Sequence, residues 1–237
     1  MRIKVIFDKK ALSEKMRIGW GVAFLVNDKI LFDTGEKGEW LIENMLSFGV
    51  DINKIEAVVI SHDHWDHWGG LWDLLQRRKG MRVYICPHFS REFKDKALLL
   101  GADLVEIEKL TQIIQNVFST GEIPGAYKGK YMAEQALVLK TGNGLTIITG
   151  CAHPGILKMV EKVKTKFPAE SIYFVLGGFH LVESDKRAVE IVAENFKKMN
   201  ILKAGPTHCS GDMAEEIFKE LYGDNFVPIK AGQDMEV

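Results

Sequence analysis

Residues 60–70 read ISHDHWDHWGG, and this stretch decides how the rest of the chain is interpreted. The chain has seven histidines, and three of them lie here within six positions, together with two aspartates. The run AVVI at 57–60 leads directly into the cluster and is typical of a strand that is buried on both faces. A buried strand that ends in imidazoles and carboxylates indicates a metal site at the end of a sheet.

The spacing within the cluster predicts two neighbouring metal positions. Side chains at i and i+2 on an extended chain point the same way, so we expect His62 and His64 to converge on one ion. Asp66 and His67 then lie in the first turn of the next helix and face a second position. Each residue taken singly has a structural explanation, such as an N-cap for Asp66, but the four together favour metal binding. Imidazole and carboxylate suit zinc, and also manganese, iron or cobalt.

Four residues cannot fill the coordination shells of two metal ions, and three later segments offer further donors. Each segment follows a predicted strand: TIITGCAHPG brings Cys151 and His153, FVLGGFHL brings His180, and KAGPTHCSG brings His208. Cys209, beside the last histidine, is expected to be a small buried residue.

Asp33, in LFDTG, ends another predicted strand. A carboxylate in that place is a candidate to accept the free N–H of a ligand histidine and so to fix the orientation of its ring. A turn aspartate before Gly35 is the structural alternative.

Hydrophobic periodicity and turn residues predict hairpins and alternating elements along the chain. Residues 20–34 form a hairpin around 27–29, and Gly142-Asn143-Gly144 marks a second hairpin. The glycine-rich segment 119–134 is too long for a simple connection and is typical of a lid or binding loop. The predicted helices span 39–48, 66–78, 90–100, 156–166, 184–198 and 212–222, and the other predicted strands span 57–60, 82–86, 171–177, 201–205 and 226–230. This order predicts an α+β fold, a four-layer αββα sandwich of two mixed sheets in a single domain over 1–237.

Composition bounds the possible partners. The 237 residues are 46% hydrophobic and 27% charged, and a formal net charge of −1 gives no support to broad attraction to nucleic acid or to an anionic membrane. No apolar run approaches the ~18 residues of a membrane span, so a cytoplasmic location is the default expectation. Three widely spaced cysteines indicate reduced thiols, not a disulfide framework.

The motifs together resemble the metallo-β-lactamase superfamily. They are LFDTG (31–35), SHDHWDHWGG (61–70), ITGCAHPGI (148–156), LGGFHL (176–181) and THCSG (207–211). The last three are most similar to the branch named for 7,8-dihydropterin-6-methyl-4-(β-D-ribofuranosyl)aminobenzene 5′-phosphate synthase. The resemblance implies an αββα sandwich with a dinuclear metal site. The metal ligands implied by the resemblance and by the spacing are His62, His64, Asp66, His67, Cys151, His153 and His208.

This sequence departs from the common family pattern at two places. Cys151 stands where most members have an aspartate that bridges the metals, in TGC instead of TGD. The usual early histidine is not visible around 131–136, and either His153 or Glu134 is expected to replace it. β-Lactam hydrolysis itself is not expected.

The expected function is that of a metal-dependent hydrolase acting on a small phosphorylated or ester-bearing metabolite, with the pterin phosphate synthase activity as a special case. Two divalent metal ions, zinc before manganese or iron, would activate a water molecule. Asp66 would orient or deprotonate this water, and His180 would donate a proton or a hydrogen bond to the substrate or leaving group. The alternatives are a phosphodiesterase or nuclease of the same fold, and a non-hydrolytic iron-binding redox or sensing protein. The expected partner is a small molecule; nucleic acid is disfavoured, no membrane is expected, and the oligomeric state stays open.

Overall fold

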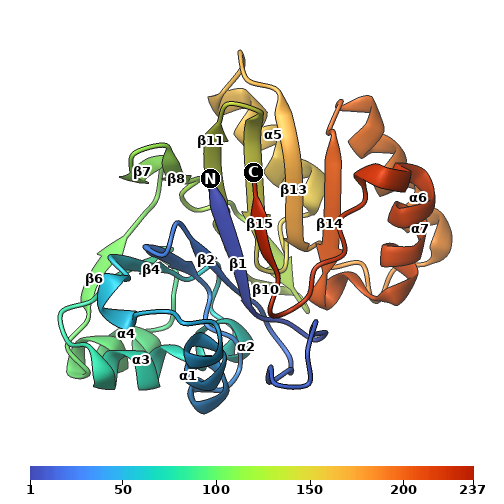
Figure 1. Ribbon diagram of the computed structural model, residues 1–237. Helices are drawn as coiled ribbons and strands as arrows, with labels where there is room; N and C mark the ends of the chain where they lie inside the picture. The colour runs from blue at the N-terminus through green and yellow to red at the C-terminus, as the bar shows by residue number, and fades with distance from the viewer. The chain divides into compact units, whose positions relative to one another are not determined.

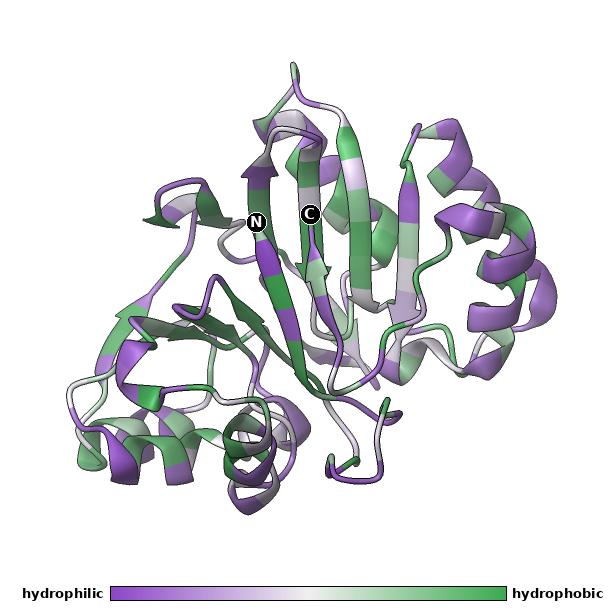
Figure 2. Ribbon diagram, in the orientation of Figure 1, coloured by the Kyte–Doolittle hydropathy of each residue, from purple (hydrophilic) through white to green (hydrophobic).

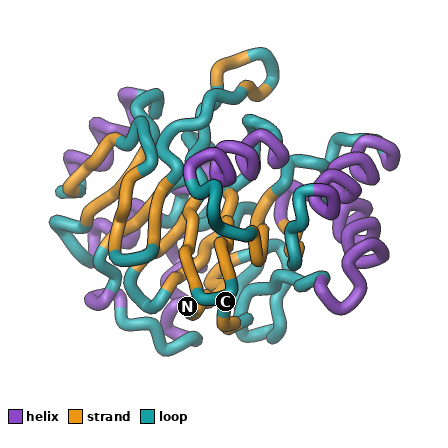
Figure 3. Tube along the Cα trace, turned by 90° about the horizontal axis from the view of Figure 1, so that it is seen from above, coloured by secondary structure: helices purple, strands orange, loops and turns teal.

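The computed structural model describes residues 1–237, which divide into two compact units (Figure 1). Unit 1 comprises Met1–Glu108 and Lys230–Glu236, and unit 2 comprises Lys109–Ile229 and the final Val237. Each unit is built on one large mixed β-sheet, and the strands of each sheet lie side by side in orange in Figure 3. The α+β class predicted from the sequence is confirmed.

Unit 1 has a seven-stranded sheet in the order β15-β1-β2-β3-β4-β5-β6. The strands are β1 (Arg2–Phe7), β2 (Ala23–Val26), β3 (Ile30–Phe32), β4 (Ala57–Val59), β5 (Arg82–Ile85), β6 (Asp103–Glu106) and β15 (Asp234–Glu236). The predicted hairpin is β2 and β3, which are joined by residues 27–29, and Asn27 and Asp28 in this turn have φ of 51° and 58°. The predicted strand before the histidine cluster is β4, which pairs in parallel with β3 and with β5 and is buried throughout.

Four helices belong to unit 1, and their apolar faces share one core with the sheet. They are α1 (Gly38–Ser47), α2 (Trp65–Trp68), α3 (Leu71–Arg77) and α4 (Arg91–Leu99). The helix predicted over 66–78 is two helices, because a turn at Gly69 and Gly70 interrupts it. A Cβ on Gly69 would lie 2.1 Å from the Glu36 carbonyl oxygen, and one on Gly70 would lie 2.3 Å from that of Thr34. The two glycines therefore let α2 press against the backbone that follows β3.

Unit 2 has a six-stranded sheet in the order β14-β13-β12-β11-β8-β7. The strands are β7 (Thr111–Ile114), β8 (Val117–Ser119), β11 (Leu137–Thr141), β12 (Gly144–Thr149), β13 (Ile172–Gly178) and β14 (Lys203–Thr207). The second predicted hairpin is β11 and β12, whereas β12, β13 and β14 run parallel to one another. The helices α5 (Ile156–Lys166), α6 (Lys186–Lys198) and α7 (Asp212–Tyr222) lie where the periodicity predicts them. Their apolar sides join the core of the sheet, and α6 and α7 are largely purple, that is hydrophilic, in Figure 2.

Residues 226–230 and 119–134 also differ from the sequence prediction. Residues 226–230 are not a strand; only Phe226 makes an isolated bridge, to Ala204, and Pro228 has no N–H to continue the pairing. The segment 119–134 holds a small hairpin of its own, β9 (Ala126–Tyr127) and β10 (Lys130–Tyr131). No helix is both long enough and apolar enough to cross a membrane.

Candidate metal centre

Three imidazoles meet at the end of β4 in unit 1. The Nε2 atom of His62 lies 3.0 Å from Nδ1 of His64, and the ring centroids of His62 and His67 are 4.2 Å apart. Asp66 is next to them, with Oδ2 3.4 Å from Nε2 of His67. Of the four, only His64 is more than slightly exposed. The structure thus brings together the four residues of the 62–67 cluster that the sequence singled out.

Hydrogen bonds fix the orientation of two of these rings. Nδ1 of His67 donates to Oδ2 of Asp33 at 2.6 Å, which confirms the predicted role of Asp33 as a partner of a histidine in the cluster. The Ser61 hydroxyl donates to Asp33 Oδ2 at 2.7 Å, so its oxygen accepts from Nδ1 of His62 at 2.9 Å. Both Nδ1 atoms are therefore occupied, and the Nε2 atoms of His62 and His67 face the cluster.

The charge around His67 is strongly negative. Burial alone would lower the pKa of His67, but the carboxylates of Asp33 and Asp66 raise it well above its ordinary value. The same two carboxylates attract a divalent cation, which competes with protons for the ligand nitrogens.

A second cluster of donors lies in unit 2, where three parallel strands end at one edge of the sheet. Thr149 of β12 pairs with Gly177 of β13, which pairs with Pro206 of β14, so the loops that follow these strands emerge together. The donors on the loops are Cys151, His153, His180, His208 and Cys209. The donor atoms of Cys151, His153 and His180 lie within 4.8 Å of one another, and so do those of Cys151, His208 and Cys209.

Glu134, one of the two candidates to replace the family's early histidine, has a different role in the structure. Its buried carboxylate accepts hydrogen bonds from the backbone N–H groups of residues 150–153 at 2.9–3.1 Å. Both oxygens are used, Oε2 by the N–H of His153. The carboxylate thus holds the loop that carries Cys151 and His153 in place.

The backbone is strained at these sites. Asp33, Ala152, His180 and His208 have φ of 57°, 64°, 52° and 52°, a left-handed conformation that residues other than glycine seldom adopt. Strain of this kind costs of order 1–3 kcal/mol per residue and gathers at functional sites, where the surrounding structure enforces it.

Cys209 and Tyr127 are the residues of unit 2 that the sequence prediction did not assign to the site. Burial would raise the pKa of the Cys209 thiol, but a hydrogen bond with Cys151 and the nearby imidazoles of His208 and His180 lower it well below its ordinary value. The hydrogen bond with Cys209 in turn raises the pKa of His180. Only the position of Cys209 directly after His208 could have signalled its proximity to the site.

Tyr127, from the small hairpin in the 119–134 segment, packs on two of the histidines. Its ring centroid lies 4.9 Å from that of His153 and 5.6 Å from that of His180. The predicted binding loop therefore contacts the donor cluster of unit 2.

A pocket of about 390 Å³ adjoins the same two histidines. It is lined by Ala152, His153, Gly155, Ile156, Leu157, Lys158, Phe179, His180, Leu181 and Val192. The volume is near the lower end of the ~300–1,000 Å³ usual for small-ligand pockets, and a mainly apolar lining with a few polar groups is typical of them.

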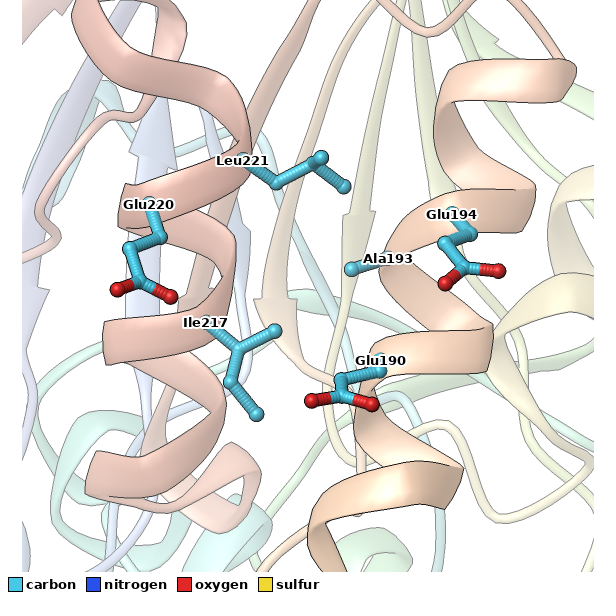
Figure 4. Close-up of a pocket in the computed structure, with 6 residues that line it drawn as sticks. All are labelled: Glu190, Ala193, Glu194, Ile217, Glu220 and Leu221. Atoms are coloured by element: carbon cyan, nitrogen blue, oxygen red, sulfur yellow. The ribbon is translucent and has the colours of Figure 1, made fainter.

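A second pocket, of about 370 Å³, lies between α6 and α7 and has no donor of the metal-binding kind except carboxylates (Figure 4). Its lining comprises Glu190, Ala193, Glu194, Ile217, Glu220 and Leu221. Arg187 already pairs with Glu190 and Glu194. These glutamates are therefore part of a surface ion-pair network.

Of the two tryptophans beside the histidine cluster, one is part of the core and one is exposed. Trp68 packs against Trp72 and Phe93 at centroid distances of 5.3 and 5.9 Å. Trp65 is 53% exposed. Only Trp65 is in a position to stack on a ligand ring.

The residues present fit divalent transition metals. Unit 1 offers the Nε2 atoms of imidazoles whose Nδ1 atoms are hydrogen-bonded to a hydroxyl or a carboxylate. Unit 2 offers imidazoles and thiols. Zinc prefers this mixture of nitrogen, sulfur and carboxylate donors, and hydrogen-bonded imidazoles are its usual ligands.

Comparison with curated proteins finds two similar sequences from Methanocaldococcus jannaschii. One is named 7,8-dihydropterin-6-methyl-4-(beta-D-ribofuranosyl)-aminobenzene-5'-phosphate synthase and is 28% identical over 259 residues, covering 90% of this chain and 88% of the relative. The other is an uncharacterized protein that is 30% identical over 258 residues, covering 95% of this chain and 96% of the relative.

Comparison with solved structures identifies the fold. Tm1679, described as a metal-dependent hydrolase of the beta-lactamase superfamily, superposes with a TM-score of 0.84 and 29% identity over 100% of this chain and 99% of its own. The short form of human tRNase Z superposes with a TM-score of 0.67 at 14% identity, over 100% of this chain and 99% of its own, a likeness of fold alone. The profile of the metallo-beta-lactamase superfamily matches residues 21–161. This chain belongs to the metallo-β-lactamase superfamily and has its fold.

Proposed function

We propose that the protein is a metal-dependent hydrolase that acts on a small phosphorylated or ester-bearing metabolite. The observation that carries this proposal is the buried cluster of His62, His64, Asp66 and His67, in which Asp33 orients His67. Such an arrangement costs stability through buried charge and strained backbone, and metal binding is the function that offsets this cost. The similarity to Tm1679, described as a metal-dependent hydrolase, supports the same reading.

The proposed cofactors are two divalent metal ions, with zinc preferred to manganese or iron. Their ligands in this proposal are His62, His64, Asp66, His67, Cys151, His153 and His208. His153 replaces the family's early histidine here, because both oxygens of Glu134 accept backbone hydrogen bonds.

A divalent metal ion held by these residues would act as a Lewis acid, lowering the pKa of a water molecule toward ~7 and polarising a carbonyl or phosphoryl oxygen. Asp66 orients that water and accepts its proton, since its carboxylate already lies beside the imidazoles. His180 donates a proton to the leaving group. The hydrogen bond with Cys209 raises the pKa of His180, which favours the protonated form that a proton donor requires.

A small-molecule substrate is favoured over nucleic acid. The pocket beside His153 and His180 has the volume and the apolar lining of a metabolite site. A net charge of −1 gives no broad attraction to a phosphate backbone. The pterin phosphate synthase activity is the special case that the relative at 28% identity supports.

The test is metal analysis joined to hydrolysis of bis(p-nitrophenyl) phosphate, with zinc, manganese or iron restored to metal-free protein. We expect about two equivalents of metal in the wild type. His62→Ala should lose both metal and activity. Asp63→Asn is the matched control, because Asp63 lies inside the motif but accepts hydrogen bonds from Ser90 N–H and the Trp68 indole. One equivalent or less in the wild type, without turnover under any metal, would reject the proposal.

A further inference from the structure

Two thiols and an imidazole converge in the interior of unit 2. The donor atoms of Cys151, His208 and Cys209 all lie within 4.8 Å of one another. The three side chains are buried, with exposed fractions of 4%, 1% and 3%, and both cysteines are reduced. Three soft or borderline donors in one buried place form a potential metal position. The proposed ligand set includes Cys151 and His208 but not Cys209.

The spacing is compatible with a tetrahedral ion. Zinc bonds of ~2.3 Å to sulfur and ~2.0 Å to nitrogen place neighbouring donor atoms about 3–4 Å apart, which is inside the observed limit. Small shifts of the side chains are therefore enough to close the three donors on one ion.

The surrounding backbone makes room for the Cys209 sulfur. A Cβ on Gly178 would lie only 2.7 Å from that sulfur, so the glycine at the end of β13 leaves the space that it occupies. The Ser210 hydroxyl accepts the N–H of Phe179 at 3.0 Å and ties the turn after β14 to the end of β13. Cys209 is thus held in position from two neighbouring strands.

We propose that Cys209 is a metal ligand and gives the metal position of Cys151 and His208 a second thiolate. This inference rests on the proposed function, and it adds a ligand and a metal preference to it. Two thiolates favour zinc, cobalt or iron over manganese and magnesium, which prefer oxygen donors. Three protein ligands leave a fourth position open, as in catalytic and not structural zinc sites.

Two simpler roles of Cys209 predict different results. In one, its thiol only donates a hydrogen bond to the Cys151 carbonyl oxygen, from which its sulfur lies 3.5 Å away. In the other, Cys151 and Cys209 lose two protons and two electrons to a peroxide, which is reduced to water, and form a disulfide.

The experiment loads metal-free, reduced protein with Co²⁺ and records the near-ultraviolet charge-transfer absorption of thiolate bound to cobalt. We expect Cys151→Ser and Cys209→Ser each to lose about half of this absorption per bound ion, and the double variant to lose nearly all of it. Cys86→Ser is the matched control, because Cys86 is the third buried cysteine and directly follows β5 in unit 1. Zinc affinity of Cys209→Ser should fall at least about tenfold, with manganese affinity unchanged.

A measurement on the wild type alone guards against a variant that fails to fold. X-ray absorption at the zinc edge averages over all bound zinc, so with two ions per protein it should count about two sulfur ligands per protein, or one per zinc on average. One sulfur ligand per protein, an unchanged cobalt band in folded Cys209→Ser, or a disulfide between Cys151 and Cys209 in protein purified with reductant would overturn the inference. Hydrolysis by zinc-loaded wild type in that case would leave the proposed function intact. A two-sulfur signal without hydrolysis would instead reject the function and keep the site.

Discussion

At the scale of single residues, hydrogen bonds to Nδ1 decide what His62 and His67 can do. Asp33 accepts a hydrogen bond from Nδ1 of His67. The Ser61 hydroxyl donates to the same carboxylate and accepts from Nδ1 of His62. One buried carboxylate thus orients two imidazoles, and their Nε2 atoms are left to face the cluster.

We therefore predict that Asp33→Ala lowers metal affinity about 10–100-fold, the usual effect of losing a carboxylate that orients a ligand histidine. Isothermal titration of metal-free protein with Zn²⁺ measures this. Asp63→Asn, whose side chain faces Ser90 and Trp68, should bind zinc like the wild type. Equal affinities in Asp33→Ala and the wild type would show that the rings hold their orientation without Asp33.

Residue types and spacing predicted the 62–67 cluster because its donors are neighbours in sequence after an apolar strand. The same reasoning found Asp33, since a carboxylate at a strand end is a usual partner of a ligand histidine. It did not place Cys209 or the carboxylate of Glu134, because their contacts join segments that lie 58 and 16–19 residues apart.

At the scale of elements, periodicity located the helices of unit 2 and both hairpins closely. Central strands such as β4 were visible as short apolar runs, but edge strands such as β6 and β7, only partly buried, carry little pattern. The predicted strand at 226–230 was wrong because proline lacks the N–H that a ladder needs.

The loop at 150–153 depends on Glu134, and we predict that Glu134→Gln lowers the free energy of unfolding by about 1–3 kcal/mol. The amide keeps one acceptor oxygen, but its NH₂ group would face the N–H of His153, and two donors would then be opposed. Urea unfolding of the metal-free protein, in the presence of a chelator, should show this loss of unfolding free energy. Glu122, half-buried in the same segment, accepts a hydrogen bond from the Tyr131 hydroxyl that a glutamine oxygen can also accept, so Glu122→Gln should change stability by less than about 0.5 kcal/mol. A loss seen only with metal present would instead make Glu134 a ligand.

Strand β15 is tied to β1 by the pair of Arg2 and Asp234, whose Nε and Oδ1 atoms are 2.7 Å apart. The hydrogen bond from Arg2 lowers the pKa of Asp234 below its ordinary 3.8. A lowered pKa stabilises the folded state above pH ~4, and this contribution is lost as the pH falls through the folded-state value. Both side chains are well exposed, so the effect is small and weakens with salt.

Asp234→Asn should therefore be slightly less stable than the wild type at pH 7 and nearly equal to it at pH 2, in urea unfolding at low salt. Glu236→Gln on the same strand is the control, because Glu236 makes no such hydrogen bond with Arg2 and should leave the pH dependence nearly unchanged. A difference for Asp234→Asn that is as large at pH 2 as at pH 7 would assign the loss to something other than the ion pair.

At the scale of the whole molecule, strand topology gathers donors that the sequence scatters. The register of β12, β13 and β14 places Thr149, Gly177 and Pro206 side by side, so residues 151, 180 and 208 follow at one edge. Each donor could be assigned to a strand end from the sequence, but which donors meet depends on strand order and register, which no local pattern encodes.

Candidate ligands occur in both units. Metal removal should therefore destabilise the protein, and loss of a ligand in either unit should reduce this effect. A ligand that binds only the folded state adds RT ln(1 + [L]/Kd), about 4 kcal/mol at a free concentration a thousandfold above Kd. Thermal unfolding with zinc and with chelator measures this difference. We predict that His62→Ala in unit 1 and His208→Ala in unit 2 each reduce it, whereas Asp63→Asn keeps it. If only one of the two histidine variants loses the zinc-dependent stabilisation, the ligands of the other unit do not bind metal and the proposed ligand set is too large.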